Sequence, residues 1–445
     1  MAMTEGIGYK RGHKPRGMKL DFIDVRRAYF YAEAARNIYI ELPEEDYEKG
    51  KVGRLRKSMY GTRDAAQNWE MEYSGFMKEI GFRQGKSTPC VFRHEARNLR
   101  VVVHGDDFTV LGHTSDLDWF RAQIKGKYEV KFRGRLGPEE NDDKSIRILN
   151  RIVEWTREGI RYEADQRHAE LIVKEVGFQE GSKSVTTPGS KNEKEDDGGE
   201  EEMDNQESTR YRAIVARAVY LAQDRTDIGF ATKELARKMS KPRVKDWASL
   251  KRMARYLIGR ERSVVRYDYQ DAQDTVEVWV DTDYAGCKET RKSTSGGVMM
   301  IGGHTVKGWS NTQRVIALPS GEAEYYGMVR GTSSGMGLRS LMKDMDVDIN
   351  IRVRTDSSAA LGVSRRRGLG KLRHIELSQL WLQERVSAGD VQVMKVKGID
   401  NLADALTKHV TQEEISMHMH GTAQEHAQGR HALAPEVAQD CAQDD

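Results

Sequence analysis

At 445 residues, the chain has room for about two or three domains, each large enough to bury a core of its own. Its 72 Lys and Arg nearly balance its 69 Asp and Glu, and the formal net charge of +3 implies no partner by itself. The 3 cysteines form no CxxC pair, which argues against a disulfide framework or a zinc site and favours a reducing intracellular compartment. No stretch is typical of a signal peptide, and no run approaches the roughly 18 apolar residues of a membrane span, so we expect a soluble protein.

After an N-terminal extension, residues 1–17, the chain mixes strand and helix signals over residues 18–180. The clearest of these signals are a strand, a helix and two strands around a turn, at residues 19–24, 25–35, 99–103 and 108–111. This mixture predicts an α/β domain.

Paired aspartates occupy that turn. Gly105 permits the tight backbone of a hairpin, and Asp106 and Asp107 follow it directly. Adjacent carboxylates at a hairpin tip are displayed rather than buried, and Asp24, at the end of the first strand, could complete a clamp for two metal ions. A solvated turn is the alternative, because Gly-Asp-Asp is also common turn chemistry.

The composition changes in the second half of the chain. Residues 181–210 are poor in apolar side chains and rich in Gly, Glu and Asp, so we expect a disordered acidic linker. Residues 211–270 have the apolar periodicity of a helical connection. Residues 275–410 begin with three strands and then alternate helices with strands, which predicts a mixed sheet covered by helices. Residues 411–445 hold histidines among Ala, Gln and Gly; we expect a disordered tail, with a metal-binding tail as the alternative.

Acidic residues end strands or lie on helices of this last domain. The four candidates for one site are Asp281, Glu324, Asp356 and Asp404. Carboxylates that converge from separate elements repel one another unless cations neutralise them, so the pattern predicts a divalent-metal site. Asp283 and Glu322 are close alternatives for the first two ligands. A solvated surface carboxylate is the alternative for each acid taken alone.

Ordered motifs resemble those of the Pol polyprotein of copia-type LTR retrotransposons, in which a reverse transcriptase precedes an RNase H. They cover about residues 18–410, and their order makes the resemblance specific. The motifs are Asp24-Val25-x-x-Ala28-Tyr29, Gly-Asp-Asp at 105–107, KSMYGTRDAAQNW at 57–69, TTP at 186–188, YRAIVARAVYLAQDRTDIGFA at 211–231, WVDTDYAGCKETRKSTSGG at 279–297, ALPSGEAEYYGM at 317–328, TDSSAAL at 355–361, RHIEL at 373–377 and NLADALTK at 401–408.

For residues 18–180 the resemblance implies a reverse-transcriptase palm and thumb. The implied catalytic ligands of two Mg²⁺ ions are Asp24, Asp106 and Asp107. Tyr29 matches the substrate-binding ring that rejects a 2′-hydroxyl, with ordinary packing as the alternative. The family has Tyr-Val where this chain has His104-Gly105, and most of the fingers would lie upstream. We therefore expect an N-terminally truncated and incomplete polymerase.

For residues 275–410 the resemblance implies an RNase H domain. Its catalytic ligands of two Mg²⁺ ions would be Asp281, Glu324, Asp356 and Asp404. His374 could relay protons near that site, or it could serve packing. A turn could contact the substrate backbone through Arg291, Lys292 and Ser293, with a simple hairpin loop as the alternative.

The implied function is Mg²⁺-dependent cleavage of RNA in RNA–DNA hybrids, together with an incomplete RNA-directed DNA polymerase. The implied partners are an RNA–DNA hybrid, an RNA template, a DNA primer and, if the polymerase half works, deoxynucleoside triphosphates. A degenerate, non-catalytic nucleic-acid-binding remnant of a retrotransposon is the alternative.

Overall fold

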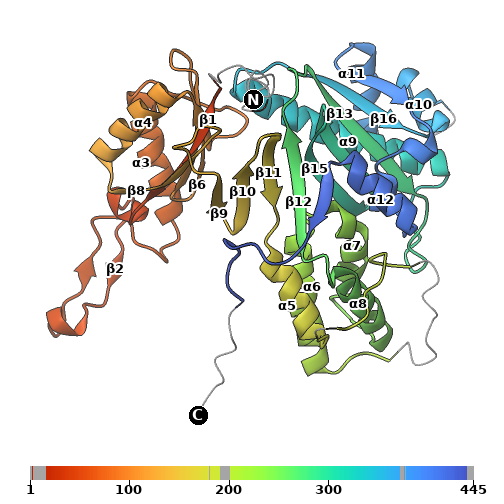
Figure 1. Ribbon diagram of the computed structural model, residues 1–445, viewed down its shortest axis with the longest axis horizontal. Helices are drawn as coiled ribbons and strands as arrows, with labels where there is room; N and C mark the ends of the chain where they lie inside the picture. The colour runs from red at the N-terminus through yellow and green to blue at the C-terminus, as the bar shows by residue number, and fades with distance from the viewer. Residues whose placement is uncertain are drawn as a thin grey trace. The chain divides into compact units, whose positions relative to one another are not determined.

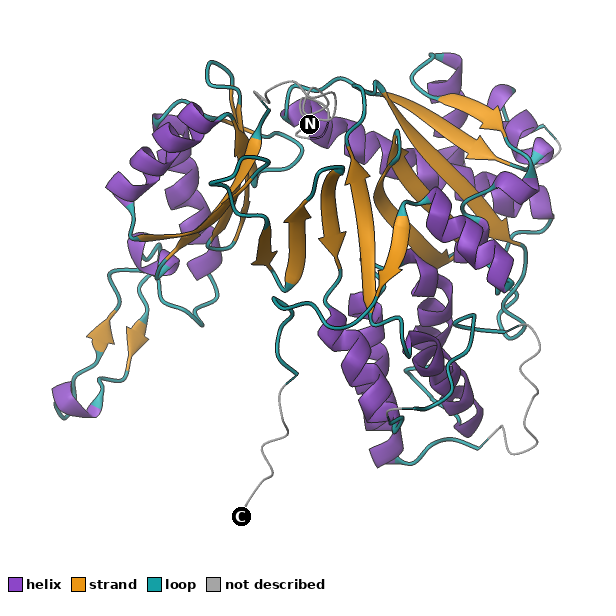
Figure 2. Ribbon diagram, viewed as in Figure 1, coloured by secondary structure: helices purple, strands orange, loops and turns teal. Residues whose placement is uncertain are grey.

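The computed structural model describes residues 3, 17–179, 181–190, 201–370, 375 and 377–437 (Figure 1). Helices and strands are interleaved along the chain, so the predicted α/β class is confirmed (Figure 2). The chain forms two compact units, residues 1–146 with 340–348, and residues 147–339 with 349–445. Among the described residues, no helix combines the length and the apolar character needed to cross a bilayer.

The described residues of the first unit include a six-stranded antiparallel sheet and the helices α3 and α4. The strand order is β4-β5-β6-β7-β1-β8. The strands are β1 (Lys19–Val25), β4 (Arg83–Gln84), β5 (Val91–His94), β6 (Leu99–His104), β7 (Asp107–Gly112) and β8 (Val130–Leu136). The helices are α3 (Ala65–Glu79) and α4 (Thr114–Lys127), and a separate hairpin joins β2 (Tyr39–Ile40) to β3 (Gly53–Arg54).

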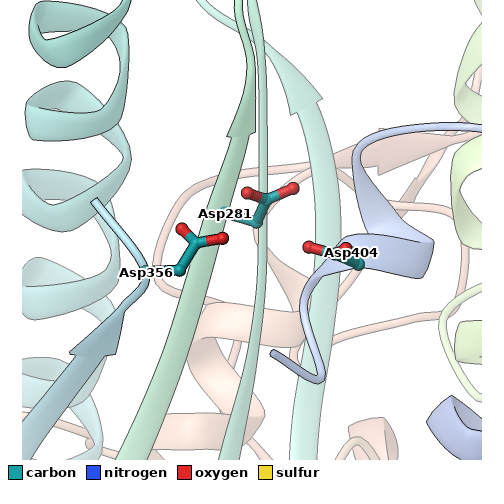
Figure 3. Close-up of side chains that lie close together, drawn as sticks. All are labelled: Asp281, Asp356 and Asp404. Atoms are coloured by element: carbon teal, nitrogen blue, oxygen red, sulfur yellow. The ribbon is translucent and has the colours of Figure 1, made fainter. Parts of the chain in front are cut away.

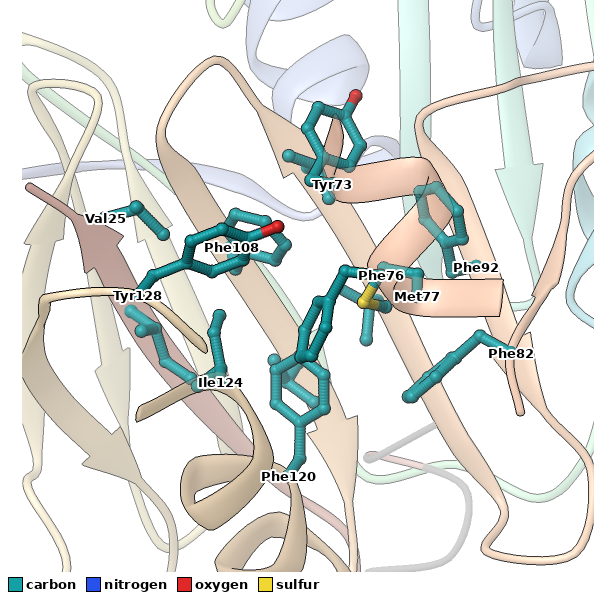
Figure 4. Close-up of a cluster of buried hydrophobic side chains, with 14 of the residues drawn as sticks. Val25, Tyr73, Phe76, Met77, Phe82, Phe92, Phe108, Phe120, Ile124 and Tyr128 are labelled. Atoms are coloured by element: carbon teal, nitrogen blue, oxygen red, sulfur yellow. The ribbon is translucent and has the colours of Figure 1, made fainter. Parts of the chain in front are cut away.

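Aromatic side chains dominate the core of this unit (Figure 4). Period-two alternation on β6 buries Leu99, Val101 and Val103. Trp69, on α3, is buried and donates a hydrogen bond from Nε1 to the carbonyl oxygen of Gly105 at 2.8 Å. This bond ties the turn between β6 and β7 to the helix, so the core fixes the position of the paired aspartates.

The helix predicted at residues 25–35 is wrong. Only a short 3₁₀ turn forms there, η1 (Ala28–Tyr31). Arg27 precedes it with a φ of 54°, a left-handed conformation that cannot continue a right-handed helix. Tyr31 contacts Tyr128 edge to face, with ring centroids 5.0 Å apart. Packing against the core therefore outweighs the local helix propensity of the segment.

The second unit contains two five-stranded sheets. The first has the order β18-β12-β11-β10-β9. Its strands are β9 (Ser145–Ile148), β10 (Arg151–Trp155), β11 (Gly159–Glu163), β12 (Arg262–Asp268) and β18 (Gln424–Ala427). Four helices accompany it, α5 (Gln166–Val176), α6 (Asn205–Leu221), α7 (Gly229–Arg237) and α8 (Val244–Leu257). Apolar side chains of α5, α6 and α8 share one core.

The predicted linker at 181–210 is ordered at both of its described ends, while residues 191–200 lie outside the described part. Thr187 is buried and accepts a hydrogen bond from Arg252 Nη2 at 2.9 Å. Helix α6 begins at Asn205, and the Asp204 side chain caps it by accepting from the backbone N–H of Glu207. The helical connection therefore starts before residue 211.

The prediction of a disordered tail at 411–445 is wrong for residues 412–427. They form α12 (Gln412–Gly421), which starts with a capping box at Thr411, and then β18. Strand β18 pairs antiparallel with β12, from Arg262 opposite Ala427 to Val265 opposite Gln424. The polar composition concealed this segment because several of its buried side chains are hydrogen-bonded rather than apolar.

A buried polar network connects this C-terminal segment to residues 224–231, the last part of the motif at 211–231. Arg225 and Asp227 are almost fully buried and form a bidentate ion pair, with Nη2–Oδ2 at 2.6 Å and Nε–Oδ1 at 3.2 Å. Tyr256 donates to Asp227 Oδ2 at 3.0 Å. His426, on β18, places Nε2 3.9 Å from Asp227 Oδ2. His418, on α12, places Nε2 2.8 Å from Thr226 Oγ1.

His426 should make a contribution to stability that is lost in mild acid. Burial, which outweighs the attraction of Asp227, lowers the pKa of His426 from 6.5 to about 4. A histidine with a depressed folded-state pKa favours the folded state while it is neutral. That contribution is lost as the pH falls below 6.5 towards 4, because the unfolded chain binds the proton first. We expect the free energy of unfolding to drop by about 2 kcal/mol between pH 7 and pH 5 from this group.

Urea unfolding at a series of pH values measures this loss. Relative to the wild type, His426→Gln should lose about 2 kcal/mol less between pH 7 and pH 5, whereas the same substitution at the exposed His420 should leave the profile unchanged. A profile that keeps its slope in His426→Gln would assign the acid sensitivity to another group.

The second sheet of this unit carries the candidate site. Its order is β15-β14-β13-β16-β17, with β13 parallel to β16 and antiparallel to β14. The strands are β13 (Thr275–Asp283), β14 (Thr294–Ile301), β15 (His304–Thr312), β16 (Asn350–Thr355) and β17 (Gln392–Lys395). The helices are α9 (Ser320–Asp344), α10 (Ser358–Arg365) and α11 (Trp381–Ser387).

Glycines spaced four residues apart let α9 approach this sheet closely. A Cβ atom on Gly327 would lie 2.5 Å from Thr282 Oγ1, and one on Gly331 would lie 2.4 Å from Val280 Cγ1. Residues four apart share one helix face, so these glycines form the contact face. Glu324, one turn before Gly327, is thereby brought over the end of β13.

Candidate functional site

Three aspartates meet at one edge of the second sheet. Asp281 lies near the end of β13 and Asp356 directly follows β16; the two strands are parallel neighbours, so their carboxyl ends share an edge. Asp404 starts the short 3₁₀ helix η6 (Asp404–Leu406). Their carboxylates point toward one another (Figure 3), and one oxygen from each lies within 4.8 Å of the other two.

Glu324 completes the electrostatic cluster from α9. Burial and then repulsion by Asp281, Asp356 and Asp404 raise its pKa to about 9. Burial and repulsion by Asp281 likewise raise the pKa of Asp404 to about 6, and the pKa of Asp356 also rises. All four acids predicted for this site therefore interact in the folded chain, and they do so at a free-energy cost.

Glu322 and Asp283, the alternative ligands, are engaged elsewhere. Glu322 is buried, and its carboxylate accepts hydrogen bonds from Leu318 N at 3.1 Å and Tyr326 Oη at 2.8 Å. It therefore stabilises the start of α9. Asp283 lies over its own loop, where a Cβ on Gly286 would collide with its carboxylate. Neither belongs to the group of aspartates with oxygens within 4.8 Å; Glu324 also lies outside that group and is linked to it by its electrostatic interaction with the three aspartates.

Thr407 and Lys408 are site residues that the sequence analysis did not single out. Thr407 is buried and its hydroxyl donates to Asp281 Oδ2. Lys408 places Nζ 2.8 Å from Asp404 Oδ2 and 4.0 Å from Asp281 Oδ2. Both belong to the motif NLADALTK, and the spacing of four residues between Asp404 and Lys408 is the available sequence signal.

The donor set fits a divalent cation. Glu324 Oε2 and Asp404 Oδ1 are buried oxygens without a hydrogen-bond partner. Unpartnered buried carboxylate oxygens are costly unless a cation satisfies them. A ligand set made only of carboxylate oxygens suits Mg²⁺, Mn²⁺ or Ca²⁺ rather than zinc or copper.

Removing the charge of Glu324 should stabilise the metal-free protein. Its raised pKa means that ionisation of this carboxyl disfavours the folded state increasingly as the pH rises above 4.5. Glu324→Gln is neutral and of similar shape, so at pH 8 in EDTA we expect about 2 kcal/mol of added stability, seen as a higher midpoint of thermal unfolding.

The matched control is Glu322→Gln, the same change on the same helix. It should lower the midpoint, because Leu318 N and Tyr326 Oη donate to different oxygens of the Glu322 side chain and Gln keeps only one acceptor oxygen. Equal shifts in the two variants would contradict the electrostatic cost assigned to Glu324.

The other residues predicted for this site differ in exposure and in their contacts. His374 lies outside the described residues. Arg291 is exposed and Lys292 half-buried in the loop between β13 and β14. Ser293 is fully buried, and its Oγ accepts from the backbone N–H of Ala285 at 3.0 Å. The prediction of a substrate contact for Ser293 is therefore corrected: its hydroxyl shapes the loop.

The carboxylates predicted for a polymerase site, in the first unit, are arranged differently. Asp24 and Asp107 are paired across β1 and β7. Arg133, on β8, places Nη2 3.2 Å from Asp24 Oδ1 and 3.5 Å from Asp107 Oδ1. Asp106 does not form a possible metal site with them. Among the described residues, only Asp281, Asp356 and Asp404 place three ligand oxygens within 4.8 Å of one another. As they lie here, these carboxylates do not fit a two-ion centre.

Tyr29, the predicted sugar-facing ring, packs within the first unit. It stacks on Tyr60 with ring centroids 4.3 Å apart and is partly buried against the core. The interpretation as a packing residue accounts for these contacts, and a role in sugar selection stays a prediction.

Comparison with known proteins supports the resemblance drawn from the motifs. Residues 16–138 match the family described as reverse transcriptase (RNA-dependent DNA polymerase). The chain is 25% identical over 415 residues to the Retrovirus-related Pol polyprotein from transposon TNT 1-94 of Nicotiana tabacum, covering 90% of this chain and 30% of that protein. It is also 25% identical over 404 residues to the Retrovirus-related Pol polyprotein from transposon RE2 of Arabidopsis thaliana, covering 87% of this chain and 26% of that protein.

A solved structure of the foamy viral protease-reverse transcriptase in complex with RNA/DNA hybrid aligns with a TM-score of 0.49 and 10% identity, covering 88% of this chain and 46% of that one. The chain spans less than a third of the length of the two Pol polyproteins. Over residues 16–138 it matches the reverse transcriptase family, and over most of its length it is similar to retroelement Pol polyproteins, so the resemblance to copia-type Pol is confirmed.

Proposed function

We propose that residues 275–410 act as a divalent-metal-dependent ribonuclease H, which hydrolyses the RNA strand of RNA–DNA hybrids within a retroelement Pol polyprotein. The observation that carries this proposal is the group of aspartates, Asp281, Asp356 and Asp404, with oxygens within 4.8 Å of one another at a sheet edge. Glu324 faces the same group from α9. Mutually repelling carboxylates lower the stability of the fold, so such a group is typical of a functional site.

In this proposal the four carboxylates hold the cations. Bound Mg²⁺ ions would supply an activated water and neutralise charge on the scissile phosphate. Thr407 keeps Asp281 in position by donating to Oδ2. Arg291 and Lys292, in the loop that follows β13, would contact backbone phosphates. Discrimination between hybrid and other duplexes would come from helix shape and the 2′-hydroxyl rather than from base identity.

RNA-directed DNA synthesis is the second candidate function, favoured by the family match of residues 16–138. It would use an RNA template, a DNA primer and deoxynucleoside triphosphates. Since Arg133 engages Asp24 and Asp107, we assign no metal-dependent step to this half and propose the nuclease as the activity of this chain.

The test is cleavage of an RNA–DNA hybrid labelled on its RNA strand, with Mg²⁺ and then with excess EDTA. We expect cleavage of the RNA strand only with Mg²⁺, and none of matched RNA–RNA or DNA–DNA duplexes. Hybrid binding without cleavage, with a steep salt dependence, would instead identify a non-catalytic nucleic-acid-binding remnant.

A further inference from the structure

One cation belonging to the chain itself lies inside the acidic cluster. Lys408 Nζ is 2.8 Å from Asp404 Oδ2 and 4.0 Å from Asp281 Oδ2. These residues supply two of the three ligand oxygens that approach within 4.8 Å. The ammonium group therefore stands beside the oxygens that would bind a divalent cation.

Lys408 and its neighbour Thr407 both contact the carboxylate of Asp281, but only Thr407 is fixed by packing. Thr407 is fully buried, and the backbone of Gly296 lies so close that a Cβ there would be 2.6 Å from Thr407 Cγ2. That packing fixes the threonine. The Lys408 side chain is 37% exposed and ends a flexible four-carbon stem, so its ammonium can leave without opening the core.

The influence of Lys408 extends over the whole cluster. Its positive charge attracts the carboxylates of Glu324, Asp356 and Asp404 and opposes their mutual repulsion. Burial opposes the charge of Lys408, and the three aspartates offset that cost. Lys408 thus offsets the negative charge of Asp404, whose other oxygen, Oδ1, is buried without a hydrogen-bond partner.

We propose that Lys408 is a displaceable counter-ion of the metal centre. It neutralises Asp404 and Asp281 in the metal-free protein, and a divalent cation binds only when the ammonium moves away. The proposal rests on the proposed function in that the four carboxylates bind metal. Two opposite consequences follow from removing the ammonium: tighter metal binding, because no competitor remains, and a less stable metal-free fold, because the repulsion is no longer offset.

The experiment titrates Mn²⁺ into the full chain by calorimetry and follows thermal unfolding in EDTA. Lys408→Gln should bind Mn²⁺ about tenfold more tightly than the wild type, because a competing charge in direct contact is removed. Its unfolding midpoint in EDTA should fall. Lys397→Gln is the matched control, since Lys397 is exposed and precedes the same segment; it should change neither quantity. Lys408→Arg keeps the charge and should retain the wild-type affinity.

Mn²⁺ affinity that is equal or weaker in Lys408→Gln than in Lys397→Gln would overturn the proposal. If none of the proteins binds Mn²⁺, the proposed function fails, and the EDTA measurement still decides the counter-ion role: a lowered midpoint supports it and an unchanged one refutes it. If Lys408→Gln gains Mn²⁺ affinity but the protein cleaves no hybrid, the nuclease function is refuted and the counter-ion role is supported.

Discussion

Asp356→Asn is expected to slow the hydrolysis of an RNA–DNA hybrid about a thousandfold, which corresponds to about 4 kcal/mol of lost transition-state stabilisation. Asp356 contributes one of the three oxygens that meet within 4.8 Å. The amide keeps the shape of the side chain but removes a negative charge, so the cluster holds cations less tightly. Single-turnover cleavage rates over a range of Mg²⁺ concentrations measure the loss.

The matched control is Asp274→Asn, which removes the same charge from an exposed position just before β13 begins. It should cleave at the wild-type rate. Circular dichroism spectra that coincide for both variants and the wild type exclude misfolding as the cause. If Asp356→Asn cleaves as fast as Asp274→Asn, the assignment of this edge as a catalytic centre fails.

Asp227→Ala is expected to destabilise the second unit by about 3–5 kcal/mol, the usual cost of leaving a buried charge without its partner. Arg225 is completely buried, and its guanidinium donates to Asp227 at 2.6 and 3.2 Å and to the carbonyl oxygen of Arg260 at 2.6 Å. Tyr256 loses its acceptor in the same substitution. Urea unfolding, followed by tryptophan fluorescence, gives the change in unfolding free energy.

Two comparisons isolate the cause of that loss. Glu425→Gln breaks a solvent-exposed pair with Arg266 in the same sheet and should cost less than about 1 kcal/mol. The double variant Arg225→Met/Asp227→Leu replaces both charges with apolar groups and should recover most of the stability lost in Asp227→Ala. A double variant as unstable as the single one would show that the network is needed for more than charge balance.

Two of the candidate acids were predictable because strand patterns position them. Asp281 and Asp356 each end an alternating run, and parallel strands bring such ends to one edge, where the structure places them. The alternating runs place these residues at strand ends, and the parallel pairing of β13 with β16 brings the two ends together. The sequence left Glu322 as an alternative to Glu324, and the hydrogen bonds that occupy Glu322 appear only in the tertiary structure.

Other features depend on contacts that no local pattern encodes. Arg133 reaches Asp24 and Asp107 because β8 pairs with β1, a neighbour more than a hundred residues away in the chain. Residues 412–427 are buried through polar side chains such as His418 and Gln424, whose partners lie on distant segments. Composition marks such residues as exposed, and only their tertiary hydrogen bonds explain their burial.

Because β18 pairs with β12, this sheet is complete only after residues 424–427 have been synthesised. Residues 262–268 leave the ribosome more than 150 residues before their partner at 424–427. Until then β12 presents an open edge, which invites association with other nascent chains. Any maturation cut that removed residues 424–427 would expose that edge again, so proteolytic trimming is compatible with this sheet only beyond Ala427.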